Sequence, residues 1–584
     1  MDTVHVNAKV NKVRLVSRLL VLLAVVTTIV TFGNSQPAYA ASFTVTNTSN
    51  SGSGSLRQAL IDANNNAGID TITFNIPGSG PHVISPLTTY SSADGSQLGS
   101  GLDGSNAVII DGCSQPGSDC SKFPLTLKVQ IDGANLPATQ NSIFNPAGIN
   151  SVVKGLSITD SRSTPLYAAF SADRVTSGGR FVCLGGLTLQ SNFLGIAPDG
   201  SAKGLISGIA PCVSGTLSFP SRIGGANPGQ GNVIGSIANY GIATNTPIFG
   251  SGSTNDWIIE GNYFGLDPTG TQARPIGDGV GALDTAIAIS GAYTDPVTQV
   301  SGVIIRNNKI ANSTRGIFMY ASSGVLIEDN EIVNNAVAGI YVAGAAKTTT
   351  GTGFPPNVVR TPFIIRENTI TGTTGGPGIA ILTTGAGFTG TPTGVTIQKN
   401  SIYGNSGPGI DLGNDGVTAN GPAGVARSGA NNLINYPVLT HVEQGSIRIT
   451  GTYAGMPNQT YTLDFYTSES GDSSGYGPGQ TWIGSTDITT DATGNAPFYV
   501  TFNTTVPGGH VVSATATNAT DGTSEFSAFQ VMPDTPMASP TTPSGSEGQL
   551  ANTGENMVTV YSVAALLVTV GVAGILRAYS RLRV

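Results

Sequence analysis

Short runs of alternating apolar and polar residues, separated by turns, recur along the middle of the chain. Six runs share one frame that ends in asparagine, at Asn192, Asn262, Asn308, Asn330, Asn368 and Asn400. Four runs continue into a Gly-Ile pair, at Gly316, Gly339, Gly378 and Gly409. The alternation predicts short strands with one inward face. The frames at Asn308 and Asn330 are 22 residues apart, which suits one coil of a three-sided solenoid.

This repeat predicts an all-β fold, a right-handed parallel β-helix over residues 41–435. One coil cannot bury its inward Val, Ile and Leu side chains alone, so identical positions stack from coil to coil. We expect each recurring Asn to occupy the corner after its strand in the left-handed conformation, and to join a hydrogen-bonded ladder. A leucine-rich repeat would need a Leu-x-x-Leu-x-Leu frame, and a β-propeller needs longer repeats.

Charged residues predict the register between two coils, over residues 302–342. Arg306 and Glu328 occupy matched outward positions, and Lys309 and Glu331 occupy the next matched pair. Because neighbouring coils lie about 4.8 Å apart, opposite charges at matched positions attract each other. A shift of one residue would lose both pairs, so the sequence indicates an Arg306–Glu328 ion pair.

Residues 55–66 precede the repeats and have the period of a helix. Their apolar residues fall on one face, at Leu56, Ala59, Leu60 and Ala63. A strand is predicted directly afterwards, at residues 69–74. We expect the helix to cover the open end of the first coil, whose strand edges would otherwise be exposed.

The segment that begins at Gly54 resembles the opening motif of a family of bacterial exported β-helix proteins. These proteins often carry Cys-Ser-Leu-Arg-Glu-Ala at this point, whereas Gly54 here replaces the cysteine and Gln58 the glutamate. The resemblance covers most of residues 43–435. It implies export and a β-helix.

The period changes after residue 435. Alternating strands are predicted at 446–453, 460–466, 496–502 and 510–517. Turn clusters between them favour a separate antiparallel β-sandwich over residues 436–532. Residues 533–549 are rich in Pro, Ser, Thr and Gly, which predicts a flexible stalk.

Residues 1–40 have the pattern of an export signal. A basic start precedes an apolar run from Leu19 to Phe32, and Ala38-Tyr39-Ala40 forms a small-x-small cleavage site. The apolar run is short for a membrane span. We therefore expect the exported protein to begin at residue 41.

The segment 550–584 predicts surface attachment. The motif Leu550-Ala551-Asn552-Thr553-Gly554 precedes an apolar stretch at 557–576, which suits one membrane helix, and a basic tail. This order resembles the LPxTG-like cell-wall sorting signal of Gram-positive surface proteins, where a sortase cuts between Thr and Gly and links Thr to the wall. Ala551 stands where the commonest form has proline, as in the variant read by class E sortases. The resemblance implies a sortase and peptidoglycan as partners. Without a sortase, 557–576 remains a membrane anchor.

The composition limits which partners and cofactors the protein is expected to have. Charged residues make up only 10% of the 584-residue chain and the net charge is −8, so no basic surface attracts nucleic acid. Cys113 and Cys120 enclose a turn-forming loop and are expected to pair, leaving Cys183 with Cys212. No Cys-x-x-Cys motif or His cluster suggests a metal, so we expect no cofactor unless the protein is a lyase, in which case Ca²⁺ is possible.

A polysaccharide enzyme of this fold would need a pair of carboxyls or a base beside acidic calcium ligands. Asp411, predicted to point outward, and Asp415 in the following turn form the best local pair. Turn chemistry explains them equally well, as it does Asp199 and Asp267.

Phe318 and Tyr341 suggest glycan binding instead. Both are outward positions on adjacent predicted coils, where their rings would offer sugars two neighbouring faces. Alternatively, a loop such as residues 344–356 covers them. We therefore expect a surface protein for adhesion or glycan binding, and a wall-displayed polysaccharide lyase or glycoside hydrolase is the alternative.

Overall fold

The computed structural model describes most of the chain between residues 40 and 534, within the first of two compact units, residues 1–536 and 537–584. The export signal up to residue 39, Cys183, Cys212 and the sorting signal lie outside the described residues. No helix among the described residues is long and apolar enough to cross a membrane. The described ranges are 40–99, 106–137, 142–144, 150–160, 168–171, 175–177, 180–182, 186–210, 221–243, 257–277, 284–290, 302–320, 324–344, 362–382 and 391–534.

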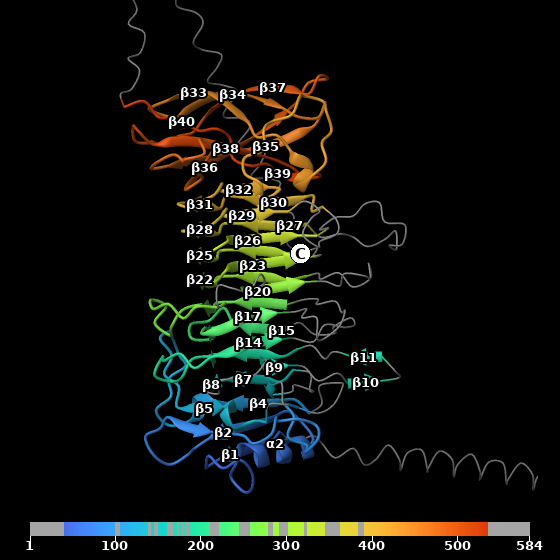
Figure 1. The fold of residues 1–584 in the computed structure, drawn as a ribbon, viewed down its shortest axis with the longest axis vertical. Coiled ribbons are helices and arrows are strands. Elements are labelled where there is room, and N and C mark those ends of the chain that lie inside the picture. Colours follow the sequence, from blue (N-terminus) through green and yellow to red (C-terminus); the bar gives the residue numbers. More distant parts are fainter. Residues whose placement is uncertain are drawn as a thin grey trace, which may run out of the picture. The chain divides into compact units, whose positions relative to one another are not determined.

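Three parallel sheets form the walls of a β-helix, which confirms the predicted fold class. Figure 1 shows their strands stacked coil upon coil. The first wall contains β1 (Ser42–Val45), β2 (Asp70–Phe74), β4 (Val108–Asp111), β7 (Val152–Lys154), β12 (Thr188–Gln190), β15 (Ser221–Gly224), β18 (Trp257–Glu260), β21 (Ile304–Arg306), β24 (Leu326–Glu328), β27 (Phe363–Arg366) and β30 (Val395–Gln398).

The second and third walls are built in the same way. The second contains β3 (His82–Ile84), β5 (Val129–Asp132), β8 (Leu156–Thr159), β13 (Phe193–Leu194), β16 (Val233–Ile234), β19 (Tyr263–Phe264), β22 (Lys309–Ala311), β25 (Glu331–Val333), β28 (Thr369–Thr371) and β31 (Ser401–Tyr403). The third contains β6 (Ser142–Phe144), β9 (Ala168–Ser171), β14 (Leu205–Ala210), β17 (Ile237–Ala243), β20 (Thr285–Ser290), β23 (Arg315–Tyr320), β26 (Ala338–Ala343), β29 (Ile379–Ile381) and β32 (Ile410–Leu412).

A few short elements lie outside the walls. They are the hairpin of β10 (Val175–Ser177) and β11 (Arg180–Val182), and three turns of 3₁₀ helix, η1 (Gly112–Ser114), η2 (Gly133–Asn135) and η3 (Ala430–Leu433). Between the strands that flank η1, Cys113 and Cys120 form a disulfide, the pairing that the enclosed turn predicts.

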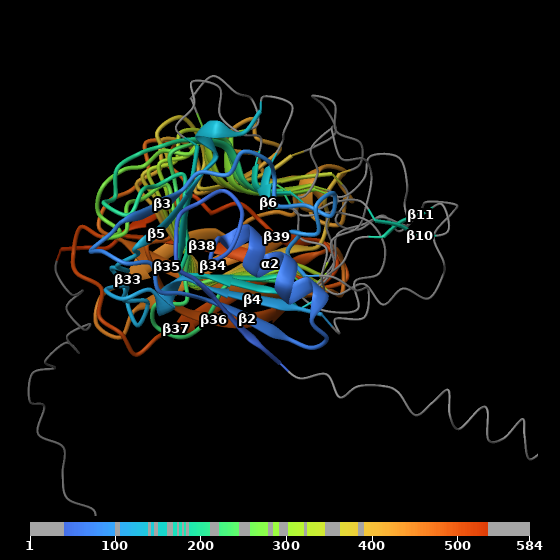
Figure 2. The ribbon, with the colours of Figure 1, turned by 90° about the horizontal axis from the view of Figure 1, so that it is seen from below.

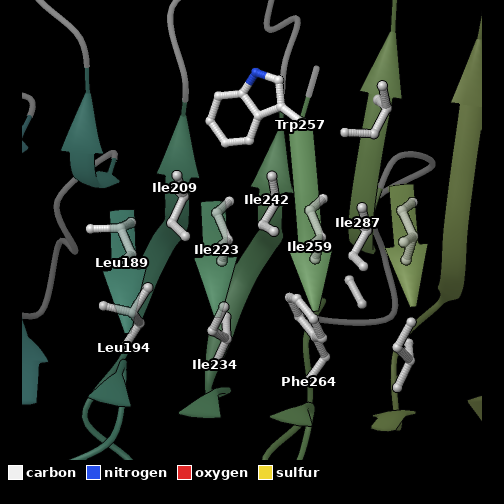
Figure 3. Close-up of a cluster of buried hydrophobic side chains, with 14 of the residues drawn as sticks. Leu189, Leu194, Ile209, Ile223, Ile234, Ile242, Trp257, Ile259, Phe264 and Ile287 are labelled. Atoms are coloured by element: carbon white, nitrogen blue, oxygen red, sulfur yellow. The ribbon is translucent and has the colours of Figure 1, made fainter. Parts of the chain in front are cut away.

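Aliphatic stacks fill the space between the walls. In Figure 3 the labelled side chains other than Trp257 form one row from each wall, and all are nearly inaccessible to solvent. The rows are Leu189, Ile223 and Ile259 from the first wall, Leu194, Ile234 and Phe264 from the second, and Ile209, Ile242 and Ile287 from the third. Alternation within each strand thus directs every second side chain into one continuous core.

A helix covers the first coil, as the sequence predicts. Helix α2 (Leu56–Asn65) begins at Ser55, whose hydroxyl accepts a hydrogen bond from the Gln58 N–H at 3.2 Å. It packs on β1, β2 and β4 (Figure 2). Its predicted apolar face is buried in the same core as the walls, at Leu56, Ala59, Leu60 and Ala63.

A β-sandwich follows the last coil. One sheet contains β36 (Thr481–Thr489), β35 (Thr460–Ser468), β38 (Val511–Asn518), β39 (Gly522–Thr523) and β40 (Gln530–Val531), and the other contains β33 (Val438–Glu443), β34 (Arg448–Ala454) and β37 (Asn495–Thr501).

The sandwich is not the separate domain that the sequence suggested. Val395 of β30 pairs with Gly522 of β39, so the first wall continues into a sheet of the sandwich. Tyr466 and Phe526 of the sandwich are buried in the β-helix core. The last coil has the same unpaired edge and open apolar end as the first, and these residues cover it.

Candidate functional site

The asparagine ladder is a structural element that runs through the repeats. Each ladder Asn is buried, and each except the last, Asn400, donates from Nδ2 to Oδ1 of the next, at 2.9–3.1 Å. Its members are Asn192, Asn232, Asn262, Asn308, Asn330, Asn368 and Asn400. Asn308 and Asn330 thus lie on neighbouring coils at the same corner. Asn232 does not fit the repeated frame, because residues 225–231 separate it from the preceding strand β15, whereas a single residue separates each of the other ladder asparagines from its strand.

The predicted backbone role of these asparagines is wrong. At six of the seven ladder positions the left-handed residue is the one before the Asn, and its φ is 56° at Ser191, 72° at Gly261, 53° at Asn307, 54° at Asp329, 57° at Glu367 and 54° at Lys399. Apart from Gly261 and from Ser191, which is buried, these corner residues have exposed side chains, whereas every ladder Asn is buried and reaches the next coil. Hydrogen bonding, not tolerance of positive φ, therefore explains the recurring Asn.

A second ladder of alternating charge runs along the outer face of the first wall. Glu260, 2% exposed at its side chain, accepts from Arg222 at 3.0 Å and from Arg306 at 2.7 Å. Glu328 accepts from Arg366 at 2.6 Å, and the Arg306 guanidinium lies 3.9 Å from it.

The register of this ladder is the predicted one. Arg306 is paired with Glu328 in the strand register, and Lys309 with Glu331, whose charged groups lie 3.2 Å apart. The closest partner of Arg306 is nevertheless Glu260, on the preceding coil. The sequence could not show which of the two glutamates lies closer to Arg306, because the coil between β18 and β21 is longer than 22 residues.

Phe318 and Tyr341 lie side by side on the outer face of the third wall. They are partners in the register of β23 and β26, and their ring centroids are 5.7 Å apart at an interplanar angle of 46°. Both rings are half-buried. The Arg315 guanidinium lies 4.9 Å from the Tyr341 ring centroid, which adds a cation–π contact. Two faces and a cation therefore converge on one patch, which we call the aromatic platform.

The platform packs against a small apolar cluster. Tyr320, Ala343 and Leu382 lie beside the rings on the same outer face, are buried, and pack against Phe318 and Tyr341. Burial raises the pKa of the Tyr341 hydroxyl, so this group stays a neutral hydrogen-bond donor at physiological pH. Of the segment 344–356 that the sequence proposed as a cover, residues 345–356 lie outside the described residues.

Asp411 and Asp415, the candidate catalytic carboxylates, belong to β32 and to the turn that follows it. Asp411 points away from the coil interior but is only 3% exposed, contrary to the prediction of an outward, accessible carboxylate. Its oxygens accept the N–H groups of Asp415 and Gly416, both at 3.1 Å. Glu525 of the sandwich lies against the same strand, and its oxygens accept the N–H groups of Leu412 and Thr418, at 2.9 and 2.8 Å. These carboxylates thus hold the backbone in place, through hydrogen bonds from its N–H groups, where the β-helix meets the sandwich.

Glu525 makes this junction sensitive to pH. Burial, opposed by its two backbone hydrogen bonds and assisted by the neighbouring Asp411, raises its pKa to about 7. The folded protein therefore binds this proton more tightly than the unfolded chain does. The resulting stabilisation is complete below the usual glutamate pKa and is lost as the pH rises through about 7.

We expect the thermal unfolding midpoint to fall as the pH rises from about 5 to about 8. In Glu525→Gln this slope should be reduced, because the residue no longer ionises. Glu469→Gln, at an exposed glutamate of the sandwich, is the matched control and should retain the slope. Parallel profiles for the wild type and Glu525→Gln would show that another group controls the dependence.

Three carboxylates lie together at one corner of the first wall. Ligand oxygens of Glu328, Asp329 and Glu367 are within 4.8 Å of one another. Burial, followed by repulsion from Glu367 and Glu328, raises the pKa of Asp329. Arg366 already neutralises Glu328, so these three carboxylates belong to the charge ladder.

Asp199 and Asp267, the two other aspartates that the sequence assigned to turns, accept turn N–H groups. Asp199 accepts that of Ser201, and Asp267 accepts those of Thr271 and Gln272.

A family match agrees with the β-helix. No curated protein matches the chain. Among solved structures, it resembles a tailspike protein, gp49 from Acinetobacter baumannii bacteriophage Fri1, a capsular polysaccharide depolymerase. The two are 10% identical, with 84% of each chain covered and a TM-score of 0.25. Residues 276–421 match a family described as "Right handed beta helix region", so the chain contains a right-handed β-helix.

Proposed function

We propose that this protein is exported, remains attached to the cell surface through its C-terminus, and binds glycans through the aromatic platform. The observation that carries the binding proposal is the pairing of Phe318 with Tyr341 on adjacent coils, beside the Arg315 guanidinium. Aromatic faces bury the apolar faces of sugar rings, and guanidinium and phenol groups donate hydrogen bonds to hydroxyls or carboxylates.

Export and attachment are supported by sequence. The signal at 1–40, the stalk and the sorting motif are in the order that a wall-anchored protein requires. We propose that a sortase cuts between Thr553 and Gly554 and links the chain to peptidoglycan. A membrane helix at 557–576 is the anchor if no sortase acts. The protein would then present its coils to polysaccharides or to other cells.

The test uses cells that display the full chain, incubated with fluorescently labelled polysaccharides of several classes. We expect the chain in the wall fraction and at least one polysaccharide bound. Phe318→Ala combined with Tyr341→Ala should weaken binding at least about tenfold, because truncating paired aromatic anchors commonly costs more than 1 kcal/mol each. Tyr499→Ala, at a sandwich tyrosine that is 65% exposed, is the control and should bind normally.

Undiminished binding by the double variant would exclude the platform as the binding site. Shortened polysaccharide products, detected during the same incubation, would instead favour the lyase or glycoside hydrolase alternative. Recovery of the full chain only in the cytoplasm would exclude export.

A further inference from the structure

A hairpin on the outer face of the second wall reaches across several coils. It starts at Asp119, beside the disulfide, and ends at Thr126, just before β5, and these two residues exchange backbone hydrogen bonds at 2.8 and 2.9 Å. At its far end the Phe123 ring stacks on Tyr263 of β19, with ring centroids 4.3 Å apart and an interplanar angle of 16°. Since β8, β13 and β16 lie between β5 and β19, the hairpin reaches about 19 Å along the wall, at about 4.8 Å per strand.

The outward side chains of the second wall are apolar where this hairpin covers them. Phe193, Val233 and Tyr263 are register partners on β13, β16 and β19, and the next residue of each strand points into the core (Figure 3). Phe193 and Val233 are fully buried, in one cluster with Leu125 and Leu127 of the hairpin segment. The same outward column is polar on the other coils, at Ser157 before it and at Lys309, Glu331, Thr369 and Ser401 after it. The apolar part of the column thus coincides with the cover.

The loop between β15 and β16 lies directly against the hairpin. Gly229 of this loop has a φ of 76°, and a Cβ there would collide with Cys120 O and Lys122 N. A Cβ at Gly231 would lie 3.0 Å from Phe123 Cε2. A side chain at Gly229 would have to displace the hairpin, so glycine permits backbone contact here. The hairpin that enters β5 therefore touches a coil that is not its neighbour in the sheet.

The disulfide fixes the start of the hairpin. Cys113 belongs to η1, and the side chain of the adjacent Gln115 exchanges two hydrogen bonds with the backbone of Ile76 on the preceding coil, at 2.8 and 2.9 Å. Gln115 is only 1% exposed, so this turn is firmly held. The disulfide joins Cys120 to this anchored turn, and both cysteines are partly exposed, within reach of a small thiol. One covalent bond therefore connects the first coils to a hairpin that extends to β19.

We propose that residues 113–127 form a redox-sensitive strap, which makes the coils from β5 to β19 open together while the disulfide is intact. Each coil of a solenoid contacts only its neighbours, and the strap adds contacts between distant coils. A dithiol reductant breaks the disulfide: one of its thiolates attacks a cysteine sulfur, and its second thiol displaces the mixed disulfide. The reductant loses two electrons and becomes a cyclic disulfide, and its two thiol protons pass to Cys113 and Cys120. The strap is then released, and the apolar column beneath it is exposed to water.

The test is hydrogen exchange followed by mass spectrometry on the purified full chain, with and without dithiothreitol. Reduction should accelerate exchange in β13, β16 and β19 at least about tenfold, because these strands lose their cover and their coupling. Strands β24, β27 and β30, further along the β-helix, should exchange as before. Cys113→Ser combined with Cys120→Ser should match the reduced protein with or without dithiothreitol, which separates this disulfide from effects on Cys183 or Cys212.

Phe123→Ala tests the far end of the strap with the disulfide intact. Loss of the stacked ring should accelerate exchange in β19 about three- to tenfold, the usual value of an aromatic pair. Lys122→Ala, at the exposed neighbour of Phe123, is the matched control and should exchange like the wild type. Unchanged exchange in β13, β16 and β19 after reduction would overturn the proposal. Equal acceleration in β24, β27 and β30 would overturn it too, because the disulfide would then stabilise the whole fold and not the strapped coils.

Discussion

Asn308→Asp is expected to destabilise the β-helix by about 3–5 kcal/mol, the cost of an unpaired buried charge or of several broken buried hydrogen bonds. Asn308 Nδ2 donates at 2.9 Å to Ile259 O, Arg306 O and Asn330 Oδ1. A carboxylate would direct an oxygen at these three acceptors. Since coils are held mainly by their neighbours, the defect interrupts the stack in its middle.

The adjacent residue provides the matched control for Asn308→Asp. Asn307 is exposed at the left-handed corner position, and the next coil carries an aspartate, Asp329, at the equivalent place. Asn307→Asp should therefore change stability by less than about 1 kcal/mol. The comparison is made by urea unfolding followed by circular dichroism. Similar midpoints for the two variants would show that the ladder contributes little to stability.

Glu260→Gln is expected to cost about 2 kcal/mol, less than the roughly 3–5 kcal/mol for breaking a fully buried ion pair. Its carboxylate is buried between Arg222 and Arg306, but both guanidinium groups are about one-third exposed, at 37% and 35%, and water screens them. Removing the negative charge leaves two like charges, on the coils that flank β18, without the carboxylate between them.

Glu331→Gln tests whether burial, and not pairing alone, determines this cost. Glu331 also pairs with a cation, Lys309 at 3.2 Å, but both side chains are nearly half exposed. We expect a change of less than about 0.5 kcal/mol, as for other surface ion pairs. Thermal unfolding at low and high salt measures both variants. Equal losses for the two would contradict a special role for Glu260.

Sequence alone determined the coil architecture, because a solenoid repeats the same local structure in every coil. Every coil must bury the same inward positions against its neighbours, so the same residue types recur at the same spacing, and two pairs of opposite charges indicate the register. The capping helix could also be predicted from the sequence, since its apolar face and the strand after it are contiguous in sequence. Phe318 and Tyr341 were placed together by the same periodicity.

Only the tertiary structure decided the rest, because those contacts join segments whose separation follows no period. Glu525 is more than 100 residues from Leu412 and Thr418, whose N–H groups its oxygens accept. The corner residue and the ladder Asn are neighbours in sequence, yet only their backbone angles show which one bends the chain. Contacts that recur with each coil can thus be predicted from the repeat, whereas burial at the junction depends on how the sandwich packs against the last coil.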